Sequence, residues 1–171
     1  MNDLPFSDPV RLHQIGTGVT RTLEPDEAAR KRIARSLDLA SLDAFTAEME
    51  LKPTEAGWRL KGRVRAEAVQ TCGLTLEPLP VVIDHRFTVG LAEAAEEETD
   101  EIVIDLDDEA PDLVEEGRID LGQYAVEQLA LSLDPFPRKP GAEFVQPPEP
   151  TEISPFSVLR GLKTSKSPEQ G

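Results

Sequence analysis

The chain has few of the side chains on which active-site chemistry depends. Its 171 residues include one cysteine, Cys72, and two histidines, His13 and His85. A single cysteine excludes an internal disulfide and a multi-cysteine zinc site. Neither histidine belongs to a metal-ligand spacing, and no nucleophile, base and orienting group occur together. We therefore expect a non-enzymatic protein with no metal and no other cofactor.

Aromatic residues and long apolar runs are also scarce. One Trp, one Tyr and six Phe are too few for a platform on which the bases of a single strand stack. No apolar run approaches the ~20 residues of a membrane span. The first ten residues have neither the basic nor the apolar region of a signal peptide. We expect a cytoplasmic protein that makes no membrane contact.

Negative charge is abundant but unevenly distributed. The net charge is −15, and 13 carboxylates with no Lys or Arg lie between Glu93 and Glu116. The rest of the chain is therefore nearly neutral. An acidic segment repels a polyanion only locally, so net charge does not exclude a nucleic-acid partner. The segment lacks the central glycine and the ligand order of a calcium-binding loop, which favours a solvated acidic loop at residues 92–101.

Periodicity predicts a single α+β domain over residues 1–140. Five stretches have the alternation of strands: Val10–Ile15, Phe45–Leu51, 58–70, Val81–Leu91 and Ile102–Leu106. Two stretches have helical spacing, one after Pro25 and one over Ile119–Leu133 with Asp120 as its N-cap. Short connections favour an antiparallel β-sheet of four to six strands with two main helices. A Pro-rich linker and C-terminal tail follow over residues 141–171.

The tail contains one apolar cluster: Phe156, Val158, Leu159 and Leu162. A short helix would bring Phe156, Leu159 and Leu162 onto one face. Because an isolated helix this short is marginal in water, we predict that it is disordered in the free protein and folds onto a partner. The alternative is that the cluster packs back on the sheet.

A row of basic residues gives the one positive argument for function that the residues themselves carry. Every second residue of the 58–70 stretch is basic over four positions: Arg59, Lys61, Arg63 and Arg65. On a strand these side chains point the same way in a row about 20 Å long, which suits the phosphates of a nucleic acid. Arg30 and Arg35 of the first helix extend the row if that helix lies nearby. The alternative is a solvated face that carboxylates on neighbouring strands, such as Glu48 or Asp84, neutralise.

Four further stretches carry a resemblance to a known family. They are Arg63–Cys72 with Leu74–Pro80, Ile119–Gly122 with Glu127–Leu131, Leu133–Gly141, and Pro155–Leu162. Together they resemble the bacterial YceD family, the large ribosomal RNA subunit accumulation proteins, over about residues 5–163. Eight of their residues make up the family motif: Gln70, Cys72, Leu76, Glu77, Pro78, Asp134, Pro135 and Pro137.

The resemblance implies a non-enzymatic factor that supports synthesis, processing or stability of large-subunit (23S) ribosomal RNA. Its partners would be ribosomal RNA or ribosome-assembly components. In the alternative, the acidic segment makes the protein an adaptor for a basic ribosomal protein or an RNA-processing factor. Some branches of the family carry extra cysteines that look like metal ligands, but Gly73 and Leu74 follow Cys72 here, so no metal site is expected.

Overall fold

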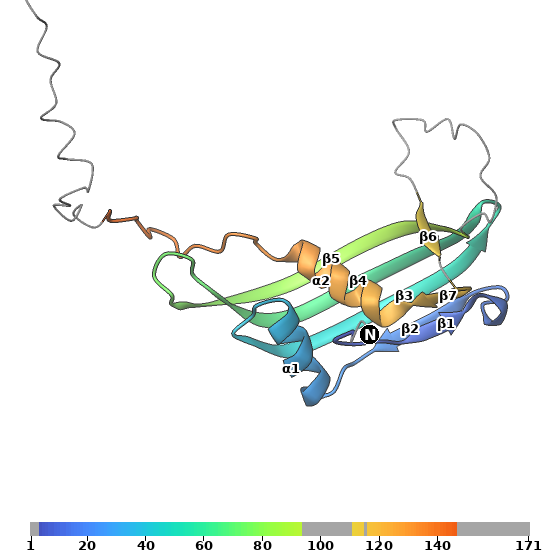
Figure 1. Ribbon diagram of the computed structural model, residues 1–171, viewed down its shortest axis with the longest axis horizontal. Coiled ribbons are helices and arrows are strands. Elements are labelled where there is room, and N and C mark those ends of the chain that lie inside the picture. Colours follow the sequence, from blue (N-terminus) through green and yellow to red (C-terminus); the bar gives the residue numbers. More distant parts are fainter. Residues whose placement is uncertain (1–3, 94–110, 115, 147–171) are drawn as a thin grey trace, which may run out of the picture.

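The computed structural model describes residues 4–93, 111–114 and 116–146 (Figure 1). A five-stranded sheet of order β2-β3-β4-β5-β6 and a separate β1-β7 pair are combined with two α-helices, which confirms the α+β class and the expected size of the sheet. The predicted strand Ile102–Leu106, the apolar cluster Phe156–Leu162 and the acidic loop beyond Glu93 lie outside the described residues.

The elements follow one another in this order: β1 (Pro9–Arg11), the 3-10 helix η1 (Leu12–Gln14), β2 (Val19–Leu23), α1 (Glu27–Ser36), β3 (Ser41–Thr54), β4 (Gly57–Thr71), β5 (Pro78–Glu93), β6 (Asp112–Val114), β7 (Arg118–Asp120) and α2 (Leu121–Ser132). All pairings are antiparallel except β5–β6, which is parallel and joins only three residues of each strand.

The three long strands β3, β4 and β5 bury one face of the sheet and expose the other. On β4, Leu60 and Val64 are fully buried. Arg59 and Lys61, the neighbours of Leu60 on either side, are exposed. This is the period-two pattern of a half-buried strand. The buried face packs against the apolar sides of α1 and α2 in one hydrophobic core, and Figure 1 shows α2 running across that face.

Gly62 lets two large side chains meet across the middle of β4. A Cβ at this position would lie 2.4 Å from Phe87 Cζ and 2.7 Å from Met49 Sδ. Phe87 and Met49 reach toward Gly62 from the strands on either side, so the missing side chain is part of the core packing.

Both helices begin at an aspartate, as their sequences favour. The Asp26 carboxylate accepts a 2.7 Å hydrogen bond from the Ala29 N–H, and Asp120 accepts one of 3.0 Å from the Gln123 N–H. Such caps satisfy N–H groups that the first helical turn leaves free. Within the described part of the chain, neither helix is long and apolar enough to cross a membrane.

The structure departs from the expected strands near the N-terminus. The predicted strand Val10–Ile15 is only Pro9–Arg11, because a 3-10 turn follows it. Strand β2 was not predicted: it has five residues, and only Leu23 among them is buried. Strand β3 begins four residues before the predicted Phe45, since a register shift between Leu42 and Ala44 interrupts the alternation on which the prediction depended.

Candidate functional site

The basic row lies on the face of the sheet opposite the helices, which we call the outer face. Arg59, Lys61, Arg63 and Arg65 alternate along β4 with core residues. The row is therefore present in the geometry that the sequence predicted. Neighbouring strands place further charges on the same face: Glu48, Glu50 and Lys52 on β3, and Asp84 and Arg86 on β5.

Two of the four basic residues are already paired with carboxylates. Arg63 Nε donates to Asp84 Oδ1 at 2.6 Å, and Arg65 forms an ion pair with Glu48. Asp84 raises the pKa of the Arg63 guanidinium, and Arg63 in turn lowers the pKa of the Asp84 carboxyl. Glu48 and Asp84 are the two carboxylates that we named for a solvated face whose charges are neutralised. That alternative is therefore correct for Arg63 and Arg65, which are half of the row.

The other half of the row is free of such contacts in the part of the chain that the structure describes. Arg59 and Lys61 make no ion pair there. Arg59 lies opposite Lys52, and Lys61 lies opposite Glu50, but Glu50 is 2.5 Å from Lys52 Nζ. The positive end of the row is therefore at Arg59 and Lys61, beside the β3–β4 hairpin.

The structure does not bring Arg30 and Arg35 into this row. Both are on α1, which buries Ala29 and Ile33 in the core on the other face of the sheet. Arg30 Nη1 instead donates to the Pro25 carbonyl at 3.0 Å, next to the beginning of its own helix.

A second candidate region lies at the end of the sheet where β4 meets the Cys72 turn. The Cys72 N–H donates to the Glu77 carbonyl at 2.9 Å, and the Leu76 N–H donates to the Cys72 carbonyl at 3.0 Å. These bonds close a turn between β4 and β5. Cys72 has no exposed surface, but its sulfur has a polar role.

The sulfur of Cys72 accepts hydrogen bonds from two segments that are far apart in the sequence. The backbone N–H groups of Lys139 and Thr75 donate to Sγ at 3.3 and 3.5 Å. The Thr75 hydroxyl, followed by these N–H groups, lowers the pKa of the thiol to about 6. Donors that point at a sulfur stabilise its thiolate, so the site favours the ionised form of Cys72.

Three more contacts fasten the segment after α2 to this turn. Gly73 N–H donates to the Pro137 carbonyl at 2.9 Å, and Gln70 Nε2 donates to the Asp134 carbonyl at 2.9 Å. Lys139 Nζ lies 2.8 and 3.0 Å from the two carboxylate oxygens of Glu77. That ion pair lowers the pKa of Glu77 and raises the pKa of Lys139. We call the turn and the segment that it holds, residues 70–78 and 134–139, the motif clasp.

The motif clasp contains all eight family-motif residues that the sequence resemblance singled out. It also includes contacts that no sequence pattern predicts, above all those of Lys139. Two of its donors to Cys72 are backbone N–H groups, which every residue other than proline carries, so no side-chain pattern could have revealed those two.

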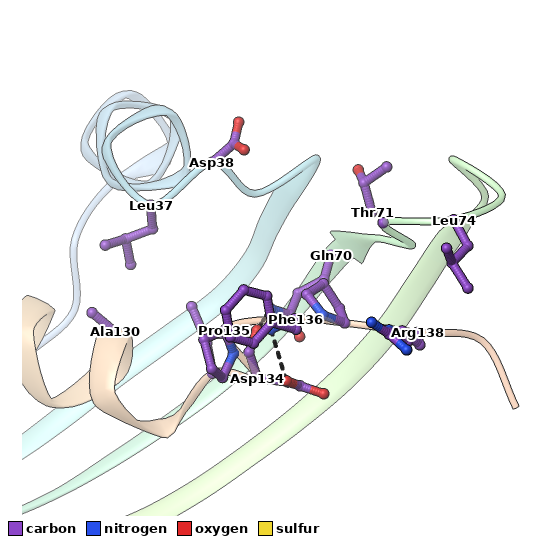
Figure 2. Close-up of a pocket in the computed structure, with 13 residues that line it drawn as sticks. Leu37, Asp38, Gln70, Thr71, Leu74, Ala130, Asp134, Pro135, Phe136 and Arg138 are labelled. Carbon is purple, nitrogen blue, oxygen red and sulfur yellow. Dashed lines mark hydrogen bonds between the residues drawn. The ribbon is translucent and has the colours of Figure 1, made fainter. Parts of the chain in front are cut away.

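A pocket of about 510 Å³ opens beside the motif clasp (Figure 2). Its apolar lining includes Leu37 at the end of α1, Ala130 on α2 and Phe136 of the clasp, while Asp38 and Arg138 add charge. Figure 2 shows Phe136 and Pro135 in the centre, with Leu37 and Ala130 to one side and Arg138 to the other. Residues from the end of α1, from α2 and from the family motif therefore line the same pocket.

Leu76 stands out in the clasp because its side chain and its backbone are both unfavourably placed. Its side chain is 77% exposed and its φ is +60°, a left-handed value that costs a leucine energy. Strained backbone that the surrounding structure holds in place is typical of functional positions. Leu76 is therefore a candidate contact residue.

A family comparison covers the part of the chain that contains the motif clasp. The model of one family, Large ribosomal RNA subunit accumulation protein YceD, matches residues 60–163. The match begins in β4 and spans the whole clasp. No curated protein and no solved structure matches the chain. The family match covers more than half of the sequence, and the chain belongs to the YceD family of large ribosomal RNA subunit accumulation proteins.

Proposed function

We propose that the protein supports the accumulation of large-subunit ribosomal RNA by binding RNA through the outer face of its sheet, without catalysing a reaction. The observation that carries the proposal is the charge of that face. Its paired positions on β3, β4 and β5 hold six cations and four carboxylates: Lys52, Arg59, Lys61, Arg63, Arg65 and Arg86 against Glu48, Glu50, Glu67 and Asp84. A net-positive face on a chain of net charge −15 is the surface on which phosphates are best accommodated.

The unpaired end of the row should contribute more to RNA binding than the paired end. Arg59 and Lys61 are exposed, so each can contact a phosphate directly and displace its counterion. Arg63 and Arg65 must first exchange their carboxylate partners for phosphate. Both pairs of residues are on the same strand and carry the same charge, so each is a matched control for the other.

The test measures binding of a large-subunit rRNA transcript over a range of salt concentrations. Replacing Arg59 and Lys61 with Gln should weaken binding and lower the slope of log affinity against log salt by about one for each phosphate contact that is lost. The Arg63→Gln, Arg65→Gln double variant should lose less, and the quadruple variant should lose most. Absence of salt-sensitive RNA binding by the wild type at low ionic strength would reject direct binding.

A second groove favours the adaptor alternative, in which the protein binds a basic partner. It has a volume of about 730 Å³, and four carboxylates line it: Asp112, Glu116, Asp120 and Glu127. Tyr124 donates to Asp112 Oδ2 at 3.1 Å inside it, and Arg118, which also lines it, is paired with Glu116. Asp112 and Glu116 belong to the acidic stretch of the sequence, so the groove extends that charge onto the folded domain.

The adaptor alternative is tested by deleting residues 94–100, which follow the last residue of β5. The deletion should slow association with basic ribosomal proteins, because charge steers encounter. It should leave the melting temperature unchanged, since it removes no residue of the strands and helices that the structure describes. Equal capture of these proteins by the deletion variant and by the full chain would exclude the adaptor role.

A further inference from the structure

One long edge of the sheet has no partner strand among the described residues. β5 pairs with β4 along nearly its whole length, but on its other side β6 covers only Leu91, Ala92 and Glu93. Figure 1 shows β5 as the upper edge of the sheet, with β6 beside one end of it. Val82 on this strand is 79% exposed. An open edge presents backbone N–H and C=O groups that another strand can pair with.

Pro80 determines which residues direct their backbone groups to the open edge. A proline in a strand is accommodated where its missing N–H would face away from the neighbouring strand. Pro80 is paired with Val69 of β4, so its nitrogen faces the open edge. Residues at even spacing from it, Val82, Asp84, Arg86 and Thr88, then direct both N–H and C=O to that edge.

The open stretch has a natural centre at His85. Pro80 limits it at one end because it lacks a donor. Pro111 limits it at the other, since it lies 3.7 Å from the point where a Cβ on Gly90 would stand. Between them nine residues, 81–89, have no strand partner on this side within the described parts of the chain, and His85 is the middle one.

The charges on β5 are self-complementary about the same residue. Asp84 and Arg86 flank His85 and are exposed on the outer face. If a second copy runs antiparallel with His85 opposite the partner's His85, Asp84 lies opposite the partner's Arg86, and Arg86 lies opposite the partner's Asp84. Opposite charges in directly facing positions stabilise a strand pair, whereas like charges destabilise it. A slip by one residue would put every side chain on the wrong face.

We propose that two copies of the chain pair through their β5 edges, antiparallel and about a two-fold axis at His85. The limits of the open stretch and the charge pattern are independent observations, and both place the axis at this residue. The pairing joins the two sheets into one, with both outer faces on the same side. Two basic rows then lie on a single continuous surface. The proposal does not depend on what that surface binds.

The first test measures self-association of the full chain by sedimentation over a range of concentrations. Arg86→Asp places like charges opposite each other twice in every dimer and should weaken dimerisation about tenfold. Arg86 makes no ion pair among the described residues and lies opposite Arg63, so the replacement should leave the monomer folded. Adding Asp84→Arg to this variant should restore dimerisation. Arg21→Asp is the matched control on β2, the opposite edge of the sheet, and should have no effect.

The second test determines the register. In the proposed pairing, Cα atoms at position 85 lie about 4.5 Å apart, within the range of a disulfide. Oxidation of His85→Cys should therefore give a covalent dimer. Thr88→Cys should not, because its two copies lie about 20 Å apart at 3.3 Å per residue.

Three results would overturn the proposal. The first is a full chain that is monomeric at every concentration. This result also overturns the proposal if the amides at 82–88 are protected from exchange in the monomer, because residues 94–110 of the same chain then cover the edge. The second is a dimer that Arg86→Asp leaves unchanged. The third is a dimer in which Thr88→Cys forms a cross-link and His85→Cys does not.

Discussion

The outer face of the sheet and the motif clasp are held together by different kinds of contact. On the outer face, the Arg63–Asp84 and Arg65–Glu48 ion pairs join strands whose backbones are already paired. In the clasp, Cys72 accepts a hydrogen bond from Lys139, 67 positions away, and Gln70 donates one to Asp134, 64 positions away. No strand pairing joins these two segments, both of which the structure describes. Losing a contact should therefore matter far more in the clasp than on the outer face.

The largest effect is expected from Cys72→Ala. The change removes the acceptor for the Lys139 and Thr75 N–H groups at a position with no exposed surface. Buried donors without acceptors are costly, so the melting temperature should fall on the order of 5 °C. Thermal unfolding followed by circular dichroism measures it. An unchanged melting temperature would show that the clasp does not need the sulfur.

A change in pH should have a smaller effect on the melting temperature, through ionisation of Cys72 in the clasp. The folded thiol has a pKa of about 6, below its value of about 8.5 in an unfolded chain. A group whose folded pKa is lowered stabilises the fold fully above the unfolded pKa, and this contribution is lost as pH falls through the folded pKa.

The melting temperature should therefore rise by a few degrees between pH 6 and pH 9. The control is Cys72→Ser, whose hydroxyl does not titrate in this range, so the difference between the two proteins isolates the thiol from other titrating groups. The same pH dependence in both proteins would contradict a lowered pKa at Cys72.

The two regions also differ in how much of them could be predicted from the sequence. The outer face follows from alternation alone: apolar residues at Leu60 and Val64 and basic ones between them determine which side of β4 is buried. Even the ion pairs with Asp84 and Glu48 were among the expected alternatives, because a strand places its charges next to those of its neighbours.

The contacts of the clasp could not be predicted in this way. The family resemblance marks Cys72 and Asp134, but it does not say that residues so far apart in the sequence meet. Their meeting depends on where α2 ends over the sheet, and the backbone N–H groups of Lys139 and Thr75 that donate to Cys72 have no sequence signal. Strand β2 escaped prediction for a related reason, since only Leu23 among its residues is buried.

Gln70→Ala should have a modest effect that is confined to the clasp. Gln70 is half-buried, and its 2.9 Å bond to the Asp134 carbonyl is one of several that hold the segment after α2. We expect the melting temperature to fall by about 2 °C, with faster amide exchange at Phe136–Lys139 and no change in β3 or β4. Faster exchange throughout the sheet would show that the clasp and the sheet open together, which would remove the distinction between the two regions.

The smallest effect is expected on the outer face, from the Arg63→Gln, Arg65→Gln double variant. Exposed ion pairs contribute little to stability, because water screens them and ordering the side chains costs entropy. The side chains of both arginines and both carboxylate partners are between 33% and 50% exposed, so the melting temperature should change by about 1 °C. If it falls as far as in Cys72→Ala, these charges are part of the framework of the sheet. If it stays, the fold does not require them, and a loss of RNA binding in the same variant is then a direct measure of their contact with phosphate.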